Sequence, residues 1–148
     1  MKIRSASLTD LENVMVWIKT KTECRTWAGP DVTFPINRDR LIEEINFCSE
    51  NSYICNFEVN VLAFGQIIKK DNGYFHLARI ISNPEFRGQG YGREICSHLV
   101  SYASTLGGDG LSLNVYSNNW AALRLYKSLG FREQKDQSNE INTYMLKT

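Results

Sequence analysis

The feature that most restricts the fold of this chain is a glycine-rich turn between a strand-like and a helix-like segment. The hydrophobic run 74–82 ends at Asn83-Pro84, and the apolar residues after the turn keep helical spacing as far as Leu106. The turn itself reads Arg87-Gly88-Gln89-Gly90-Tyr91-Gly92. Glycines permit positive φ and let a ligand approach the backbone, while the free N–H groups of a first helical turn attract negative charge. The segment therefore predicts a phosphate or pyrophosphate site.

Two familiar phosphate loops fit this turn poorly. A P-loop ends in Gly-Lys-Ser/Thr, whereas Gly92 is followed here by Arg93-Glu94. A dinucleotide fingerprint needs GxGxxG within a βαβ unit, whereas these glycines are spaced GxGxG and follow a hairpin marked by Asp71-Asn72-Gly73. Arg87 and Arg93 are positioned to add charge-assisted contacts. The alternative is a loop whose glycines only turn the chain.

Strand-like and helix-like segments alternate along the rest of the chain without a linker or repeat. A helix is expected to start at Thr9, with Glu12 completing a capping box, and another at the cap Asn37. Residues 24–35 are expected to be irregular. Further helices are expected at 90–106 and 119–129, and strands at 1–6, 53–59, 61–70, 74–82, 111–115, 131–136 and 141–147. This order predicts an α/β (α+β) fold, with a mixed, mostly antiparallel central sheet flanked by helices, in a single domain spanning 1–148.

Composition excludes several classes of protein. The chain has 148 residues, of which 43% are hydrophobic and 22% charged, as in ordinary globular proteins. A net charge of +1 offers no field for nucleic acid, so an RNA-binding role for the Arg/Gly/Tyr segment is disfavoured. No apolar run reaches membrane-spanning length, and the sequence MKIRSASLTD lacks the apolar core of a secretory signal. A cytoplasmic protein that binds no membrane is expected.

The cysteines are scattered and show no metal-binding spacing. No pair is spaced CxxC, and only His76 and His98 could supplement them, so no metal site is expected. Cys48 and Cys96 fall on apolar helical stripes and are expected to be small core residues, although catalytic Cys–His chemistry stays an alternative. Free thiols are expected at all four positions, namely Cys24, Cys48, Cys55 and Cys96.

A second motif downstream adds specificity to the glycine turn. It runs from Asn119 to Phe131 and reads NWAALRLYKSLGF. Together the two motifs resemble the GCN5-related N-acetyltransferase (GNAT) family. The matching positions are Arg87, Gly90 and Gly92 in the first motif, and Asn119, Ala122, Tyr126, Gly130 and Phe131 in the second. The expected order of elements agrees with this family over nearly the whole chain, and residues 20–50 match only loosely.

This resemblance implies an acetyl-CoA-dependent acyltransferase without a metal. The family's tyrosine acid corresponds to Tyr126, for which core packing on the face shared with Leu125 and Leu129 is the alternative. Asn119 corresponds to the asparagine that touches the cofactor arm. The implied acetyl-pantetheine track is Ile80, Ile81 and Ser82, and the implied pyrophosphate loop is Arg87, Gly88, Gln89, Gly90, Tyr91, Gly92 and Arg93.

The implied reaction is direct attack of a neutral amine on the thioester, with a backbone N–H near Ile80 stabilising the oxyanion. The general base is not assigned. Asn114 stands where some family members have glutamate, and Tyr74 stands where histone-type members have it. His76 has a suitable unperturbed pKa of about 6.5, but a histidine satisfied within the sheet is the alternative. Because no carboxylate stands at position 74 or position 114, a non-catalytic CoA-binding module is an alternative function.

The acceptor is expected to be a small-molecule or peptide amine. In this family the segment after the first helix covers the acceptor pocket. Its candidate wall residues here are Cys24, Arg25, Trp27, Asp31 and Phe34. Trp27 fits a core anchor equally well. Arg79 is a further candidate, with a structural salt bridge as its alternative, and the exposed sheet edges are compatible with a homodimer.

Overall fold

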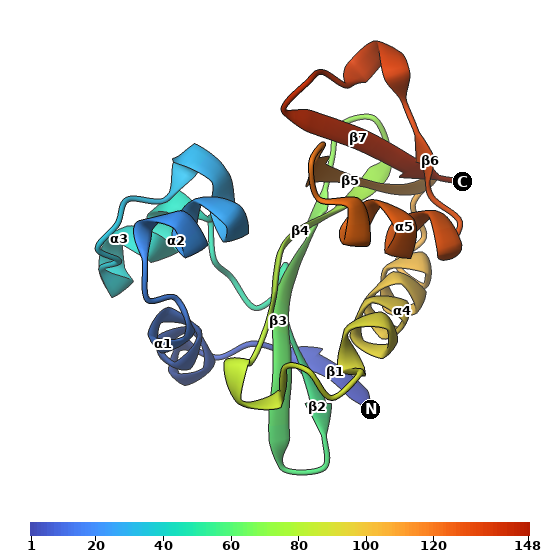
Figure 1. Ribbon diagram of the computed structural model, residues 1–148. Helices are drawn as coiled ribbons and strands as arrows, with labels where there is room; N and C mark the ends of the chain where they lie inside the picture. The colour runs from blue at the N-terminus through green and yellow to red at the C-terminus, as the bar shows by residue number, and fades with distance from the viewer.

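A seven-stranded sheet separates two groups of helices in the computed structural model, which describes residues 1–148 (Figure 1). The strand order is β1-β2-β3-β4-β5-β7-β6, and only β4 and β5 are parallel. The expected mixed, mostly antiparallel sheet is therefore confirmed. The strands are β1 (Lys2–Ser5), β2 (Ser52–Phe57), β3 (Asn60–Lys69), β4 (Tyr74–Ser82), β5 (Gly110–Tyr116), β6 (Arg132–Glu133) and β7 (Asn142–Lys147).

Each face of the sheet is covered by its own helices and its own apolar core. The first face carries α1 (Leu8–Trp17), α2 (Lys21–Ala28) and α3 (Arg38–Glu44), and the opposite face carries α4 (Tyr91–Ser104) and α5 (Trp120–Ser128) (Figure 1). Leu11, Leu41 and Phe64 are completely buried in the core beside α1–α3. Leu99 and Met145 are almost completely buried in the core beside α4 and α5. The two cores fix the sheet between the two helical layers.

The first helix begins earlier than the sequence pattern predicts. Its cap is Ser7, whose hydroxyl accepts a hydrogen bond from the N–H of Asp10 at 3.2 Å, while the Asp10 carboxylate accepts one from the N–H of Ser7 at 2.8 Å. The predicted capping box of Thr9 and Glu12 is therefore wrong. Ser7 and Asp10 have the same three-residue spacing, and Arg4 on the neighbouring strand also binds Asp10. This additional contact favours the earlier cap.

The segment 24–35, which was expected to be irregular, begins inside a short helix. Thr20 caps α2 by accepting a hydrogen bond from the N–H of Glu23 at 3.1 Å. Cys24, Trp27 and Ala28 have the i, i+3, i+4 spacing of one helical face, and all three are buried. Gly29, with a φ of 65°, ends the helix and starts the 3-10 turn η1 (Gly29–Asp31). The helix was missed because its other positions are polar.

Two smaller expectations also fail. Cys48 is exposed, because α3 ends at Glu44 and the chain turns at Asn46, where φ is 52°. The strand expected at 131–136 is limited to β6, because a 3-10 turn, η3 (Lys135–Gln137), follows. Cys96 is buried as expected, and all four cysteines are free.

None of the helices has the length and apolar character needed to cross a membrane. No three His, Cys, Asp or Glu side chains are grouped as metal ligands would be.

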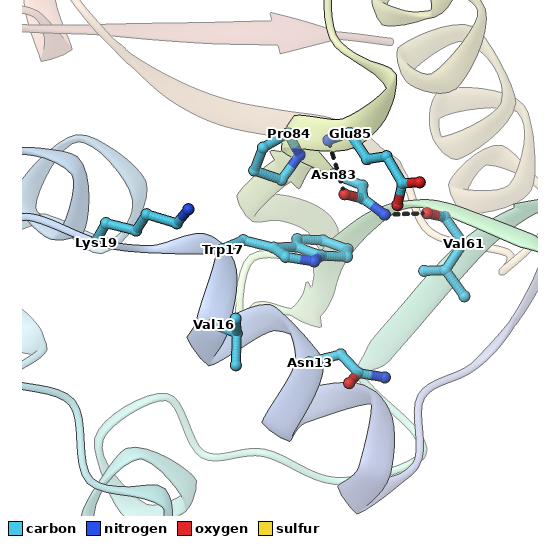
Figure 2. A pocket seen from close by; sticks show the side chains of 8 residues that line it. All are labelled: Asn13, Val16, Trp17, Lys19, Val61, Asn83, Pro84 and Glu85. Carbon is cyan, nitrogen blue, oxygen red and sulfur yellow. Dashed lines mark hydrogen bonds between the residues drawn. The ribbon is translucent and has the colours of Figure 1, made fainter.

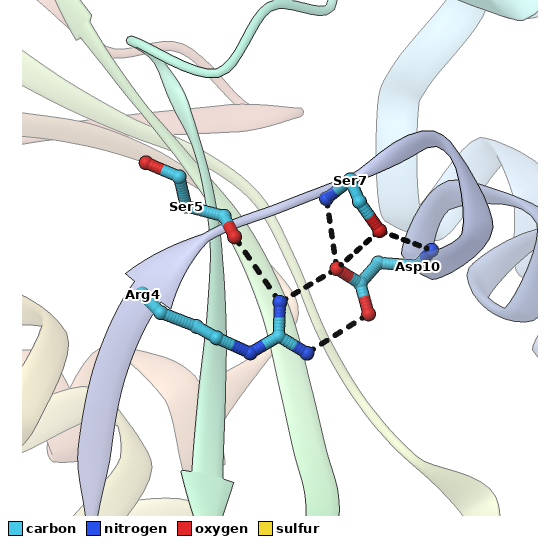
Figure 3. Close-up of polar contacts among 4 residues, drawn as sticks. All are labelled: Arg4, Ser5, Ser7 and Asp10. Carbon is cyan, nitrogen blue, oxygen red and sulfur yellow. Dashed lines mark hydrogen bonds and ion pairs between the residues drawn. The ribbon is translucent and has the colours of Figure 1, made fainter.

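We expect replacement of Asp10 by alanine to lower the free energy of unfolding by about 2 kcal/mol at pH 7. Its side chain is 8% exposed, and it accepts hydrogen bonds from both Nη atoms of Arg4, at 2.7 and 3.0 Å, besides the Ser7 cap (Figure 3). The loss leaves Arg4 and the first turn of α1 without their shared acceptor. Urea denaturation of both proteins measures the difference.

The pH dependence of this difference follows from the Asp10 pKa. Burial raises that pKa, but the hydrogen bonds from Arg4 and Ser7 outweigh burial and lower it overall. The stabilisation is therefore complete when the pH is above the pKa of Asp10 in the unfolded chain, about 4, and is lost as the pH falls through its lower pKa in the folded protein. Asp39→Ala is the matched control, since Asp39 also lies in the first turn of a helix beside an arginine but is 82% exposed. Equal losses in both variants would contradict the prediction.

Candidate functional site

The two parallel strands at the centre of the sheet separate halfway along. β4 pairs with β5 from Tyr74, opposite Gly110, only as far as Leu77, opposite Leu113. β4 then continues beside β3 to Ser82, while β5 continues beside β7 to Tyr116. Beyond Leu77 the edge of β4 that faces β5 has no strand partner. This gap leaves main-chain groups available at the middle of the sheet.

A β-bulge lies where the strands separate. Ala78 is opposite Gln66 and Ile81 is opposite Phe64, so Arg79 and Ile80 face the single residue Gly65. Arg79 has a φ of 51°, which is rare for a residue other than glycine. Such bulges redirect side chains and occur frequently beside active sites.

Trp27 of α2 holds the bulge in place. Its indole Nε1 donates a hydrogen bond to the carbonyl oxygen of Arg79 at 2.8 Å, and its ring lies 6.2 Å from that of Phe64. Trp27 is 7% exposed and belongs to the core beside α1–α3, yet it also lines the cavity described next. Trp27 is therefore a core anchor, and it also borders the cavity.

A cavity of about 430 Å³ passes through the gap between the strands. It reaches from α2 and η1, through β4 and β5, to α5 on the other face of the sheet. Its lining includes Trp27, Asp31, His76, Arg79, Ile80, Asn114, Asn119 and Tyr126. Of the expected wall residues, Trp27 and Asp31 line it. Cys24, Arg25 and Phe34 do not.

Tyr126 projects from α5 to the cavity and is 9% exposed. Its ring packs edge-on against Phe131 with centroids 5.8 Å apart, and its hydroxyl lies 3.7 Å from Sγ of Cys96. Burial, followed by the nearby Cys96, raises the pKa of Tyr126 well above 10. The phenol is therefore protonated at neutral pH. It both packs in the core and lines the cavity, so the two interpretations of this residue are compatible.

The glycine turn offers a row of unused main-chain donors at the start of α4. The N–H groups of the six residues from Gly88 to Arg93 donate no hydrogen bond within the protein. Gly88 and Gly90 have φ values of 78° and 82°, and no atom lies within 4 Å of a Cβ built at Gly88, Gly90 or Gly92. This open row of donors at a helix N-terminus is suited to a phosphate-containing ligand.

The two arginines of the turn are engaged by the protein. Arg87 donates from Nη2 to the carbonyl oxygen of Ser82 at 3.0 Å, which links the turn to the end of β4. Arg93 Nη1 donates to Oγ of Ser128, which links α4 to α5. Asn119 caps α5 through Oδ1, which accepts from the N–H of Ala122 at 3.2 Å. These side chains fix the geometry around the cavity and the turn.

His76 is satisfied within the sheet. Its Nδ1 lies 2.7 Å from Oγ of Ser112, and its ring stacks on Tyr144 with an interplanar angle of 13°. Burial, with smaller contributions from Lys70 and Arg79, lowers its pKa to about 4. His76 is neutral at pH 7 and is a weak base.

No other side chain around the cavity is a buried base. Asn114 lines the cavity but cannot accept a proton at neutral pH, and the one carboxylate in the lining, Asp31, is 67% exposed and lies 3.8 Å from Nη2 of Arg79. A general base is therefore not identified. Sequence reasoning also missed Gln66, a completely buried polar residue that binds Arg79. The signal that could have found it is a polar residue within an otherwise apolar strand.

A separate hollow of about 390 Å³ lies at the end of α1 (Figure 2). Trp17 and Val16 border it on one side, and the η2 turn (Pro84–Phe86) on the other. Asn83 holds this turn by donating to the carbonyl oxygen of Val61 at 2.9 Å and accepting from the N–H of Glu85 at 3.0 Å. The hollow shares no residue with the cavity, and we assign no ligand to it.

Comparison with known proteins decides the family. A model of the Acetyltransferase (GNAT) family matches residues 20–131. The chain belongs to the GNAT acetyltransferase family. The resemblance expected from the glycine turn and the Asn119–Phe131 motif is thereby confirmed, and the sheet with its separated β4 and β5 is this chain's version of that family's fold.

Three proteins illustrate the family relationship. The Escherichia coli [ribosomal protein bS18]-alanine N-acetyltransferase is 32% identical over 88 residues, which cover 60% of this chain and 57% of that protein. The Escherichia coli L-amino acid N-acyltransferase MnaT is 29% identical over 82% of this chain and 59% of its own length. Each alignment thus spans less than two thirds of the curated relative. The structure of spermidine N-acetyltransferase from Vibrio cholerae, in complex with CoA and spermine, aligns with a TM-score of 0.77, 19% identity and coverage of 98% and 93% of the two chains.

Proposed function

We propose that the protein is an acetyl-CoA-dependent N-acetyltransferase. The observation that carries the proposal is that β4 connects two kinds of site. The middle of this strand borders the cavity beside the protonated Tyr126, and its C-terminal end leads to the six unused N–H groups of the glycine turn. An extended ligand with a pyrophosphate at one end and a reactive thioester at the other matches that layout.

The residues of the turn and of β4 fit CoA. The open space at Gly88 and Gly90 admits a pyrophosphate close to the main chain, where six N–H donors have no competing acceptor. The unpaired edge of β4 at Ile80, Ile81 and Ser82 offers main-chain groups to a pantetheine arm, as a neighbouring strand would. Asn119 uses its Oδ1 for capping, so its Nδ2 stays available to the same arm.

Acetyl-CoA would supply the activated acetyl group that an amine attacks directly. A main-chain N–H near Ile80 would stabilise the developing oxyanion, a contribution of about 3 kcal/mol in other enzymes. Tyr126 would donate its proton to the leaving thiolate, because its raised pKa keeps it protonated over the working range of pH. With no base identified, the amine would arrive neutral or lose its proton to water.

The acceptor class is an amine. According to their names, the relatives described above act on a ribosomal protein, on L-amino acids or on spermidine, so the family alone does not choose among these acceptor classes. The cytoplasmic location and the homodimer expected from the sequence stay predictions.

We expect acetyl-CoA to raise the melting temperature of the protein, since a ligand at about 100 times its Kd stabilises the folded state by about 2.7 kcal/mol. We also expect CoA thiol release that depends on an added amine, measured with panels of amino acids, polyamines, aminoglycosides and short peptides. Mass spectrometry of the product should show an added acetyl group.

Two outcomes would contradict the proposal. Binding of acetyl-CoA without release by any amine would favour a CoA-binding module. Stabilisation by RNA and not by acetyl-CoA would instead favour a nucleic-acid-binding domain.

A further inference from the structure

The cavity contains a guanidinium whose charge the protein leaves largely unpaired. The side chain of Arg79 is 16% exposed. Its Nη1 donates to Oε1 of Gln66 at 2.8 Å, which is the only hydrogen bond that this side chain donates. Its Nε is buried and has no partner. A guanidinium carries several further donors, so most of its capacity for hydrogen bonding is unused.

The nearest carboxylate does not satisfy this charge. Oδ2 of Asp31 lies 3.8 Å from Nη2 of Arg79, beyond hydrogen-bonding distance, and the Asp31 side chain is 67% exposed. Burial lowers the pKa of Arg79, and the opposing influence of Asp31 is the smaller of the two. A buried charge with so few partners is costly to the protein. A second anion in the cavity would offset that cost.

The backbone holds Arg79 in this environment at a conformational cost. The β-bulge and its φ of 51° turn the Arg79 side chain toward Gln66, and Trp27 fixes the Arg79 carbonyl from α2. Unfavourable backbone conformations of this kind persist where surrounding structure enforces them, and they concentrate at functional sites. Arg79 is therefore held by one contact to its side chain and one to its main chain.

The other charges around the cavity favour an anion as well. Lys70 adds a second positive charge, and His76 is neutral at pH 7. Asp31 is the only acidic residue in the lining. A polycation would meet an excess of like charge here, whereas a carboxylate would meet an excess of opposite charge.

We infer that the acceptor is a small amine that carries a carboxylate close to its amino group, and that Arg79 binds this carboxylate. The planar guanidinium matches a carboxylate with two parallel hydrogen bonds. Arg79 is next in the chain to Ile80, where the proposed acetyl-pantetheine track begins. A carboxylate bound to Arg79 would therefore keep the nearby amino group of the same molecule beside the thioester. The inference rests on the proposed function and narrows it to amino-acid-like acceptors.

The test compares each L-amino acid in a panel with its own carboxamide, which removes the negative charge and keeps the side chain. The amino group of an amino-acid amide is less basic than that of the free amino acid, so a larger fraction of it is neutral and able to attack. Without recognition of the carboxylate, the amide would therefore react faster. We expect kcat/KM for the best amino acid to exceed that for its amide by about 30-fold, as loss of one partner of a buried charge pair predicts.

Variants assign the preference to Arg79. Arg79→Gln should abolish the preference, so that the ratio of kcat/KM for the amino acid to kcat/KM for its amide falls from about 30 to about 1. Arg79→Lys should restore part of the preference, because it returns the charge without the planar fork. Arg38→Gln is the control, since Arg38 forms its ion pairs at the surface, away from the cavity. Melting temperatures confirm folding in each case.

Four results would overturn the inference. The first is a wild-type protein that acetylates the amide as well as the corresponding amino acid, and this result needs no variant. Equal losses for both acceptors in Arg79→Gln would assign Arg79 a structural role through Gln66. Acetylation of polyamines or peptides, but of no amino acid, would leave the proposed function intact and remove this inference alone. Absence of acetylation with every amine would instead remove both.

Discussion

Replacing Tyr126 with phenylalanine is expected to lower kcat by about 100- to 1000-fold while leaving the Kd for acetyl-CoA unchanged, as loss of a general acid predicts. Phenylalanine keeps the ring that packs against Phe131 and removes only the hydroxyl. The one hydrogen-bond partner of that hydroxyl is a thiol at 3.7 Å, a weak contact, so stability should change little. Steady-state thiol release and calorimetric titration with acetyl-CoA separate the two quantities.

Tyr53→Phe is the matched control for this variant. Tyr53 is also buried, and its hydroxyl donates to the carbonyl oxygen of Glu50 at 2.8 Å, but it lies outside the cavity. This variant should lose some stability and keep its kcat. A Tyr126→Phe protein with undiminished turnover would show that Tyr126 only packs in the core. A rise in the Kd for acetyl-CoA equal to the loss of activity would assign it to binding.

The pH dependence of turnover bears on the same residue. Because burial and Cys96 raise the Tyr126 pKa, the acid form should persist to high pH, and activity should not fall above pH 9 through loss of this proton. His76, with its pKa of about 4, should not set the acidic side of the profile near neutrality. The rise of activity with pH should then follow deprotonation of the acceptor amine.

Features that depend on local sequence were predictable here. The glycine turn, the hairpin at Asp71-Asn72-Gly73 and the hydrophobic run of β4 each carry their own signal, and they predicted the main strands and α4 within a few residues. The turn and the Asn119–Phe131 motif also sufficed to indicate the family.

Features that depend on distant contacts could not be predicted in the same way. His76 contacts Ser112, which is 36 positions away, and a stacked ring from β7, and burial among such distant neighbours is the main cause of its lowered pKa. The bulge at Arg79 depends on the registers of β3 and on Trp27, 52 positions earlier. Sequence alone left both residues with two interpretations. Their tertiary surroundings decide between the interpretations: the hydrogen-bonding capacity of His76 is met within the sheet, whereas that of Arg79 is largely unmet.

The glycine turn carries the second large prediction. Gly90→Val is expected to raise the Kd for acetyl-CoA by about 100-fold, which corresponds to about 2.7 kcal/mol. Gly90 caps α4 with a φ of 82°, and the space where its Cβ would stand is open. A valine there would place a branched side chain beside N–H groups that have no other acceptor, and so exclude a pyrophosphate from them. Calorimetric titration measures the change.

Gly107→Val separates this steric effect from backbone strain. Gly107 has a φ of 81°, no atom lies within 4 Å of its Cβ position, and it follows the other end of α4. Both valine variants force the same left-handed backbone and should lose similar stability, about 1–2 kcal/mol. Only Gly90→Val should lose affinity for acetyl-CoA. If both variants bind equally well, the six N–H groups do not hold the pyrophosphate; if both lose affinity equally, strain within α4 explains the effect.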